Sequence, residues 1–216
     1  LLWTDNYNEP RKISISKSIQ GTTDVNTQTK LVINNIITND DVGEKHITVI
    51  KDRPLQAPSV VTEIAEEEEE RVFEKDFVRF SLRYKYNDGE YSAFGPFTDV
   101  VFKPGEFDLP INETYNSGML NHIKSITLKN FISSTLPKDV VQIDILYKQE
   151  DSTVVYSVDS LTPSDTEWSG DSYIIYSENI RAALPSNQFL RVWDNVPKKA
   201  LAQEVTGNRI VYANYT

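Results

Sequence analysis

Residues 77–102, FVRFSLRYKYNDGEYSAFGPFTDVVF, carry the clearest β-hairpin pattern in the chain. Apolar and polar residues alternate from Val78 to Tyr86, and a period of two places the two sets on opposite faces of a strand. Asn87-Asp88-Gly89 tolerates the positive φ angles of a tight turn, after which the chain returns towards Pro104-Gly105. The pattern predicts a β-rich structural or binding module, and it contains no arrangement typical of catalysis.

The composition describes a folded, acidic chain. Hydrophobic residues make up 39% of the 216 residues and aromatic residues 11%, which is more than a disordered segment holds. The net charge of −10 repels phosphate backbones and anionic lipids, so we expect no specific nucleic-acid binding. The absence of cysteine excludes disulfides, thiolate zinc sites and cysteine nucleophiles. No apolar run of about 18 residues occurs, so we expect no membrane span.

The first residues resemble no targeting signal. Leu1-Leu2-Trp3 lacks the charged start and the apolar centre of a signal peptide, and no initiator Met precedes it. We therefore expect the chain to be a processed or excised piece of a longer one.

Turn residues and proline pairs divide the chain into four segments. Short strands recur at intervals of roughly 8–12 residues, which is typical of a sandwich or a propeller. Parallel α/β folds need long crossover helices, and the pattern contains none. We predict an all-β fold, with segment bounds as follows: a β-rich flank over 1–53, sandwich parts over 54–109 and 110–180, and a β-rich return over 181–216.

Within the flank and the return, the pattern predicts several particular elements. In the flank, an alternating strand pattern begins with Ile13, Ile15 and Ile19. Residues 39–43 predict a turn, and residues 46–51 predict a strand. After residue 176 the helix candidates are Ser177–Leu184, which Pro185 stops, and Pro197–Gln203, where proline suits the first position. Residues 210–215 again predict a strand.

No residue set assigns a catalytic, cofactor or metal site. His46 and His122 each lie within an alternating strand pattern, where a histidine is more often structural than catalytic. The nucleophile elbow and the phosphate-binding glycine motifs do not occur. We therefore predict a protein that is not an enzyme and that holds no cofactor.

Acidic clusters leave weaker alternatives open. Asp40, Asp41 and Glu44 are able to ligate calcium from a turn, but the EF-hand order of ligands is missing, and a plain turn is favoured. Glu66–Glu70 is favoured as a solvated acidic loop, with a divalent ion or a basic partner as the alternative. Asn112 and Asn214 begin glycosylation triplets that are frequent by chance.

Aromatic residues around the hairpin turn form the remaining candidate. Tyr84, Tyr91, Phe94 and Phe97 lie close together in sequence. Aromatic rings form platforms for sugars, but they fill cores more often because they dominate buried area. Core packing is the favoured interpretation, and a binding cluster is the alternative.

Two kinds of resemblance to known families are present. FSLRYKYNDGEYSAFGPF (80–97) and VVQIDILYKQEDSTVVYSVDSL (140–161) are similar to strands of fibronectin-III-like sandwiches. LLWTDNYNEPRKI (1–13) and FLRVWDNVPKKALAQEVTGNRIVYANYT (189–216) resemble tail structural proteins of short-tailed, crAss-like bacteriophages, known as stabilisation, nozzle or muzzle proteins. The motif residues of this second resemblance are Trp3, Asp5, Pro10, Trp193, Asp194, Pro197, Gln203, Glu204, Asn208 and Arg209.

The resemblance implies a structural role in a virion. The two end segments would be blades of a β-propeller, with a fibronectin-III-like sandwich inserted between them. The protein would form a ring-shaped homo-oligomer, contact other tail proteins, and be soluble in the host cytoplasm before assembly into the phage tail. An acidic surface suits a channel that DNA passes without binding. The alternative is a carbohydrate-binding or adhesion module that uses Tyr91, Phe94 and Phe97.

Overall fold

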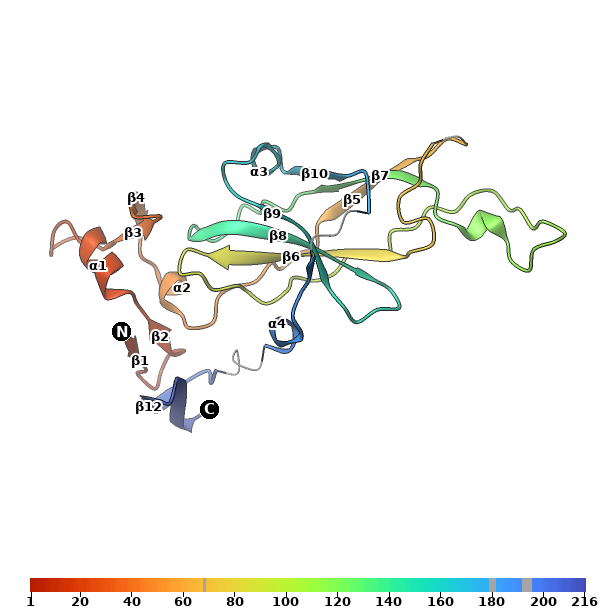
Figure 1. Ribbon diagram of the computed structural model, residues 1–216. Helices are drawn as coiled ribbons and strands as arrows, with labels where there is room; N and C mark the ends of the chain where they lie inside the picture. Colours follow the sequence, from red (N-terminus) through yellow and green to blue (C-terminus); the bar gives the residue numbers. More distant parts are fainter. Residues whose placement is uncertain (68, 179–181, 192–195) are drawn as a thin grey trace.

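The computed structural model describes residues 1–67, 69–178, 182–191 and 196–216, and strands dominate it (Figure 1). Strands account for 37% of the residues and helices for 11%, so the prediction of a mostly β chain is confirmed. The strands are β1 (Leu2–Trp3), β2 (Arg11–Lys12), β3 (Lys30–Ile33), β4 (Ile36–Asp41), β5 (Ser59–Ile64), β6 (Val78–Tyr86), β7 (Ile123–Lys129), β8 (Val140–Gln149), β9 (Tyr156–Leu161), β10 (Ser172–Ile175), β11 (Ala182–Ala183), β12 (Ala200–Thr206) and β13 (Arg209–Tyr215). The helices are α1 (Ile15–Gly21), α2 (Glu44–Ile47), α3 (Thr166–Gly170), α4 (Ser186–Leu190) and the 3₁₀ turn η1 (Ser117–Met119).

Two antiparallel sheets share one hydrophobic core, and we call this part, β5 to β11, the two-sheet unit. One sheet has the order β10-β7-β5 and the other β11-β9-β8-β6. The expected parts 54–109 and 110–180 each contribute strands to both sheets, and one core cluster joins them. The boundary expected near residue 110 therefore does not separate two folding units.

β6 and β8 form the longest strand pair. They are antiparallel and run in register from Val78 opposite Gln149 to Lys85 opposite Gln142. The alternation predicted for β6 is confirmed, because its apolar residues all lie in the core cluster: Val78, Phe80, Leu82, Tyr84 and Tyr86. The pairing therefore fixes which face of the sheet is buried against the second sheet.

The other face of this pair holds a buried ion pair. Arg83 lies directly opposite Asp144, and its Nε and Nη2 donate to Asp144 Oδ2 at 3.1 and 2.6 Å. Gln142 and Ser160 donate to Asp144 Oδ1, so both carboxylate oxygens are satisfied. The two side chains are only 5% and 3% exposed, and each supplies the counter-charge that the other needs away from water.

The return after the hairpin turn follows β6 with a period of three residues. Four backbone N–H groups donate at 2.8–2.9 Å to carbonyls of every second residue of β6: Ser92 to Tyr84, Gly95 to Leu82, Thr98 to Phe80 and Val101 to Val78. Three residues are also the period of a polyproline II helix. Pro96, which has no N–H, falls between the donors. The period places Tyr91, Phe94 and Phe97 at equivalent positions on the return.

The flank and the return differ from several expected elements. Residues 15–21 form α1 rather than a strand, residues 39–41 lie in β4 rather than a turn, and residues 44–47 form α2. The helix expected over 197–203 is wrong, because residues 200–206 pair with β13. The helix expected over 177–184 is also wrong where it is described, since 182–183 form β11 beside β9, and 179–181 lie outside the described residues. At residues 182–183 and 200–206, strand pairing outweighs local helix propensity.

The flank and the C-terminal hairpin β12–β13 lie at the same end of the molecule (Figure 1). Asn6 N–H donates to the Ala200 carbonyl at 3.1 Å, and the Thr4 hydroxyl donates to the same oxygen. The sheets at this end, β1–β2, β3–β4 and β12–β13, each have two strands. The described part of the chain therefore contains no four-stranded propeller blade at this end.

We expect Asp144→Ala to destabilise the fold strongly, because it leaves the Arg83 guanidinium buried without its carboxylate. Breaking a buried pair in this way costs about 3–5 kcal/mol of unfolding free energy. Urea denaturation followed by circular dichroism measures the change. The control is Glu150→Ala, which removes the exposed partner of Arg79 on the same strand pair and costs less than about 1 kcal/mol. Equal losses in the two variants would contradict the assigned burial.

Candidate functional site

The turn of the central hairpin connects the two-sheet unit to the N-terminal flank. Asn87 Nδ2 donates to the Val32 carbonyl at 2.6 Å, and Asn87 Oδ1 accepts from Asn34 N–H at 3.2 Å. The Asn87 carbonyl accepts from Lys17 Nζ at 3.0 Å. One turn residue thus holds three positions of the flank. The turn can present these groups because Gly89 adopts a φ of 86°, which glycine allows without strain.

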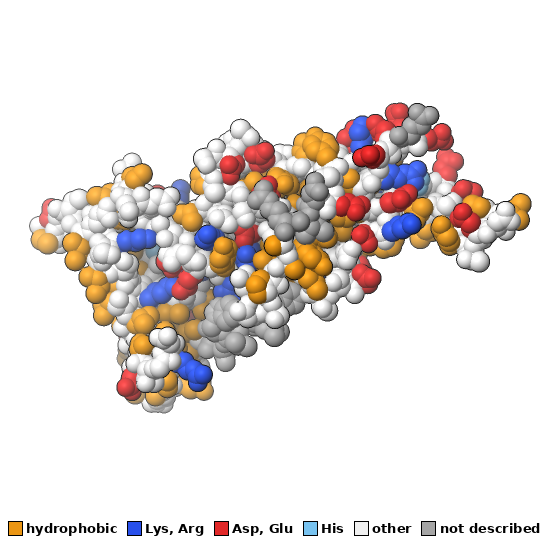
Figure 2. All heavy atoms as spheres, in the orientation of Figure 1, with side chains coloured by type: hydrophobic (Ala, Val, Ile, Leu, Met, Phe, Trp, Pro, Cys, Tyr) orange, Lys and Arg blue, Asp and Glu red, His pale blue; other side chains and the backbone are white. Residues whose placement is uncertain are grey.

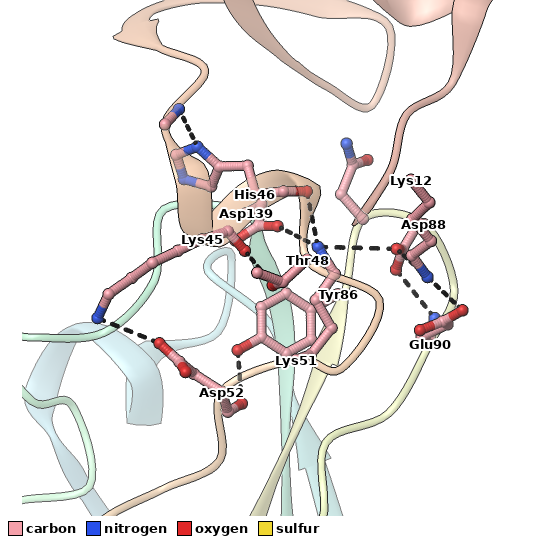
Figure 3. Close-up of polar contacts among 12 residues, drawn as sticks. Lys12, Lys45, His46, Thr48, Lys51, Asp52, Tyr86, Asp88, Glu90 and Asp139 are labelled. Carbon is pink, nitrogen blue, oxygen red and sulfur yellow. Dashed lines mark hydrogen bonds and ion pairs between the residues drawn. The ribbon is translucent and has the colours of Figure 1, made fainter. Parts of the chain in front are cut away.

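Lys51 lies at the centre of the polar contacts beside this turn (Figure 3). Its side chain is 3% exposed, and Nζ donates to the His46 carbonyl at 2.9 Å and to Asp139 Oδ2 at 3.3 Å. Asp88 Oδ2 is 3.8 Å away, and the Tyr86 ring centroid lies 5.2 Å from Nζ. A buried ammonium is therefore surrounded by two carboxylates, a carbonyl and a ring face, each of which stabilises its charge.

The charges around Lys51 shift the pKa values of neighbouring groups. Burial alone would raise the pKa of Asp88, but the nearby Lys12 and Lys51 outweigh it and hold that pKa below its ordinary value. Lys12 Nζ lies 3.2 Å from Asp88 Oδ2 and also pairs with Glu90. Burial, followed by the negative charge of Asp139, raises the pKa of Tyr86. With a lowered pKa Asp88 stays charged and with a raised pKa Tyr86 stays neutral near neutral pH, which suits a permanent contact.

A cavity of about 290 Å³ lies between the flank and the turn. Its wall includes Ile13, Val32 and Ile47 as well as Lys17 and Asp139. Asp139 is buried, and its Oδ1 has no hydrogen-bond partner among the described residues. The cavity is large enough for water, which would satisfy this oxygen.

The predicted aromatic cluster separates into a core residue and an outer row. Tyr84 belongs to the core cluster, whereas Tyr91, Phe94 and Phe97 are half-buried and lie outside it. The Arg83 guanidinium carbon is 4.1 Å from the Tyr91 ring centroid and 5.9 Å from that of Phe94. Tyr91 and Phe94 therefore cover a buried arginine, whereas the Phe97 ring centroid lies 5.2 Å from Lys148 Nζ.

A second cavity of about 470 Å³ adjoins this row. It is lined by the turn, by α4 and by the C-terminal hairpin, including Tyr91, Gln188 and Ile210. Arg83 contributes to the wall, but Asp144 and Gln188 already accept its hydrogen bonds. The lining thus includes one aromatic residue, the amide residues Asn187 and Gln188, and the charged residues Glu90 and Arg191, beside a guanidinium already in use.

The segments that hold the motif residues contact each other. Asp5 accepts hydrogen bonds from the N–H groups of Tyr7 and Asn8 at 2.9 and 2.8 Å, and so caps the turn that leads to Pro10. This turn meets β12 through Ala200, as described above. Trp193 and Asp194 lie outside the described residues.

The remaining motif residues lie along the C-terminal hairpin or just before it. Asn208 follows Gly207 in the hairpin turn, and both have positive φ, of 59° and 52°. Gln203 lies opposite Tyr212, and neither Gln203 Oε1 nor the Tyr212 hydroxyl has a partner within the described part of the chain. Trp3 is half-buried in β1, Pro197 is half-buried before β12, and Glu204 and Arg209 are exposed.

The other sequence candidates do not converge on a site. Asp41 pairs with Lys30, and Glu44 pairs with Arg11. Over the described ranges, no group of three His, Asp or Glu side chains is placed to hold a metal ion. His46 Nδ1 accepts from Gly43 N–H at 2.9 Å and so helps to start α2.

The sequence did not indicate that residues of the flank and of the two-sheet unit, distant in the chain, would contact each other beside the turn. Lys51 and Asp139 are 88 positions apart, and nothing in either local pattern indicates a shared contact. The Asn-Asp-Gly turn was recognisable, but its role in holding the flank depends on the fold of residues 12–51.

Lys51→Met should loosen the flank. The variant leaves Asp139 buried without a cation, and loss of one partner of a buried pair costs about 3–5 kcal/mol. Hydrogen exchange followed by mass spectrometry should show faster exchange over residues 1–50, with less change in β8. Lys45→Met is the control, because Lys45 pairs with Asp52 at an exposed position. Unchanged exchange in the flank of Lys51→Met would contradict the role of Lys51.

Asp5 should titrate well below an ordinary aspartate. The Asn8 side chain, then the backbone N–H groups of Asn8 and Tyr7, lower its pKa to about 2. Because the folded pKa lies below the unfolded one, the carboxylate stabilises the turn above the ordinary pKa of about 3.9 and loses this effect as pH falls towards 2. Carboxyl carbon NMR measures the titration, and Asn8→Ala should raise the midpoint. An ordinary midpoint in the unmodified chain would refute the capping role.

No helix in the described ranges is long and apolar enough to cross a membrane, in agreement with the sequence expectation. No protein-family model matches the chain, and no curated protein matches it.

Proposed function

We propose that the protein is a structural component of a bacteriophage tail, of the nozzle, muzzle or stabilising type, that acts through packing with other copies and not through catalysis. The contact between the two motif-bearing ends carries this proposal. Residues 4–6 bind β12 through Ala200, so the segments that resemble tail proteins meet outside the two-sheet unit. This is the arrangement that an inserted domain requires.

The two-sheet unit supports the finer description of a fibronectin-III-like sandwich. Two antiparallel sheets enclose one core, and the long β6–β8 pair crosses its middle. The insertion would enter through residues 54–58 and leave after β11. The flanking two-stranded sheets would then be parts of blades that other segments or other copies complete.

Exposed apolar residues at the flanking end support packing with other molecules. Leu201, Val205 and Tyr215 on the C-terminal hairpin are 57%, 59% and 67% exposed. A two-stranded sheet is marginally stable by itself, and large exposed apolar surfaces mark contact sites. This hairpin is therefore suited to burial against a partner.

Charge is distributed unevenly along the chain. Residues 54–180 hold 23 acidic and 10 basic residues and have a net charge of −13, whereas the two flanks together have a charge of +3. Acidic side chains gather at the end of the two-sheet unit that lies away from the flank (Figure 2). An acidic surface of this kind lets DNA pass without binding to it.

A carbohydrate-binding module is the second candidate, favoured by the cavity beside Tyr91. Arg83 and Lys85 already lie over this ring, at 4.1 and 5.4 Å from its centroid, so a sugar would stack where these two cations leave the ring open. A glycan array on the unmodified chain and on Tyr91→Ala separates the candidates. Binding that Tyr91→Ala abolishes favours adhesion, and no binding to any glycan removes this candidate.

The structural role predicts where the protein is found. Antibodies against the chain should label the tails of particles of the phage whose genome encodes it, as seen by negative-stain electron microscopy, and should leave the heads unlabelled. Mass spectrometry of purified particles should detect the protein in stoichiometric amounts. Unlabelled tails together with protein present only in the soluble lysate would refute a virion role.

A further inference from the structure

Residues 103–119 form an arm that leaves the two-sheet unit at the end opposite the flank (Figure 1). Phe107 and Leu109 are 78% and 53% exposed, and Ile111, in the turn that follows them, is 101% exposed. Asp108 and Pro110 alternate with them. A period of two with apolar residues on one face is the pattern of a strand packed on a partner. Here the pattern occurs on a segment that belongs to none of the sheets.

The two backbone edges of this segment differ. Asp108 N–H donates to Asn116 Oδ1 at 2.9 Å, the Asp108 carbonyl accepts from Ser117 N–H at 2.7 Å, and the Pro110 carbonyl accepts from Glu113 N–H at 3.0 Å. Pro110 has no N–H. One edge is therefore satisfied within the arm.

The opposite edge is open. Alternate residues of an extended chain present their N–H and C=O groups to opposite sides. On the second side, the backbone groups of Phe107 and Leu109 make no hydrogen bond to any residue that the structure describes. An unpaired edge with an apolar face is a template for pairing with another sheet.

The C-terminal hairpin has complementary properties. β12 contacts residues 4–6 through Ala200, whereas β13 has β12 as its one strand neighbour among the described strands. Val211 and Tyr215 expose apolar surface along β13. Residues 196–216 hold three basic residues and one acidic residue, and the arm holds three acidic residues and one basic residue. Attraction between these opposite charges would orient the pairing.

We propose that residues 106–110 of one copy add as a third strand to β13 of a second copy of this chain. The arm and β13 lie at opposite ends of the molecule, so the contact joins two copies (Figure 1). It uses two different surfaces, and such a head-to-tail contact closes into a ring or extends into a filament. The inference rests on the proposed assembly of many copies and names the surfaces that make it.

Three variants of the full chain test the contact by sedimentation velocity at low salt over a range of concentrations. The arm variant is Phe107→Asp with Leu109→Asp, and the hairpin variant is Val211→Asp with Tyr215→Asp. Each places charge in an interface that would be apolar, and should weaken self-association by more than about tenfold. The control is Val25→Asp, an exposed position outside both surfaces, which should assemble as the unmodified chain does.

Mixing the variants tests the head-to-tail geometry. The arm variant retains an intact hairpin, and the hairpin variant retains an intact arm. An equimolar mixture should therefore form a dimer of one copy of each and nothing larger. A mixture that remains monomeric, or that forms larger species, would overturn the proposal.

The outcomes separate this inference from the proposed function. If both variants assemble as the unmodified chain does, other surfaces form the contact. The inference then fails while the proposed function stands. An unmodified chain that stays monomeric at every concentration refutes assembly by packing.

If a variant has lost its cooperative unfolding transition, charge reversals replace it. Glu113→Lys and Arg209→Glu should each weaken assembly and restore it when combined in one chain, and a failure of restoration overturns the contact.

Discussion

The pairing of β6 with β8 is the interaction on which the rest of the structure depends. Its inner face supplies the aromatic and aliphatic side chains of the core, and its outer face buries the Arg83–Asp144 pair. The turn after Tyr86 holds the flank, and the return along β6 places Tyr91 and Phe94 over Arg83. Gln188, at the centre of α4, accepts a hydrogen bond from the same arginine. A shift of this register by one residue would exchange the two faces and remove each of these contacts together.

Buried cations explain how an acidic chain fixes the relation of its parts. Arg83 pairs with the carboxylate of Asp144, and Lys51 lies between those of Asp88 and Asp139; each partner comes from a segment distant in sequence. Such pairs add little net stability compared with apolar packing, but an unpaired member is costly. They therefore select one arrangement over others that would bury a charge alone. Arg83 does this within the two-sheet unit, and Lys51 does it between that unit and the flank.

Sequence patterns predicted what depends on local periodicity. The faces of β6, its Asn-Asp-Gly turn and the strand at 210–215 follow from a period of two and from residues that tolerate positive φ. Residues 197–203 were mispredicted as a helix because Pro197 suits a helix start, and the partner strand β13 is not visible in a local window. The contact of Lys51 with Asp139 depends on the complete fold. The period of three in the return is carried by Ser92, Gly95, Thr98 and Val101, and a period of two does not reveal it.

The distribution of charge favours contacts between different surfaces of two copies over contacts between identical surfaces. The acidic residues of the arm accompany its exposed apolar side chains, and the basic residues near β12 and β13 accompany theirs. A two-fold contact between identical arms would bring carboxylates together, and a two-fold contact between identical hairpins would bring lysines and arginines together. Contact between the arm of one copy and the hairpin of the next brings opposite charges together at every interface. Because the pair then still has one free arm and one free hairpin, the same physical preference that forms the first contact also propagates it.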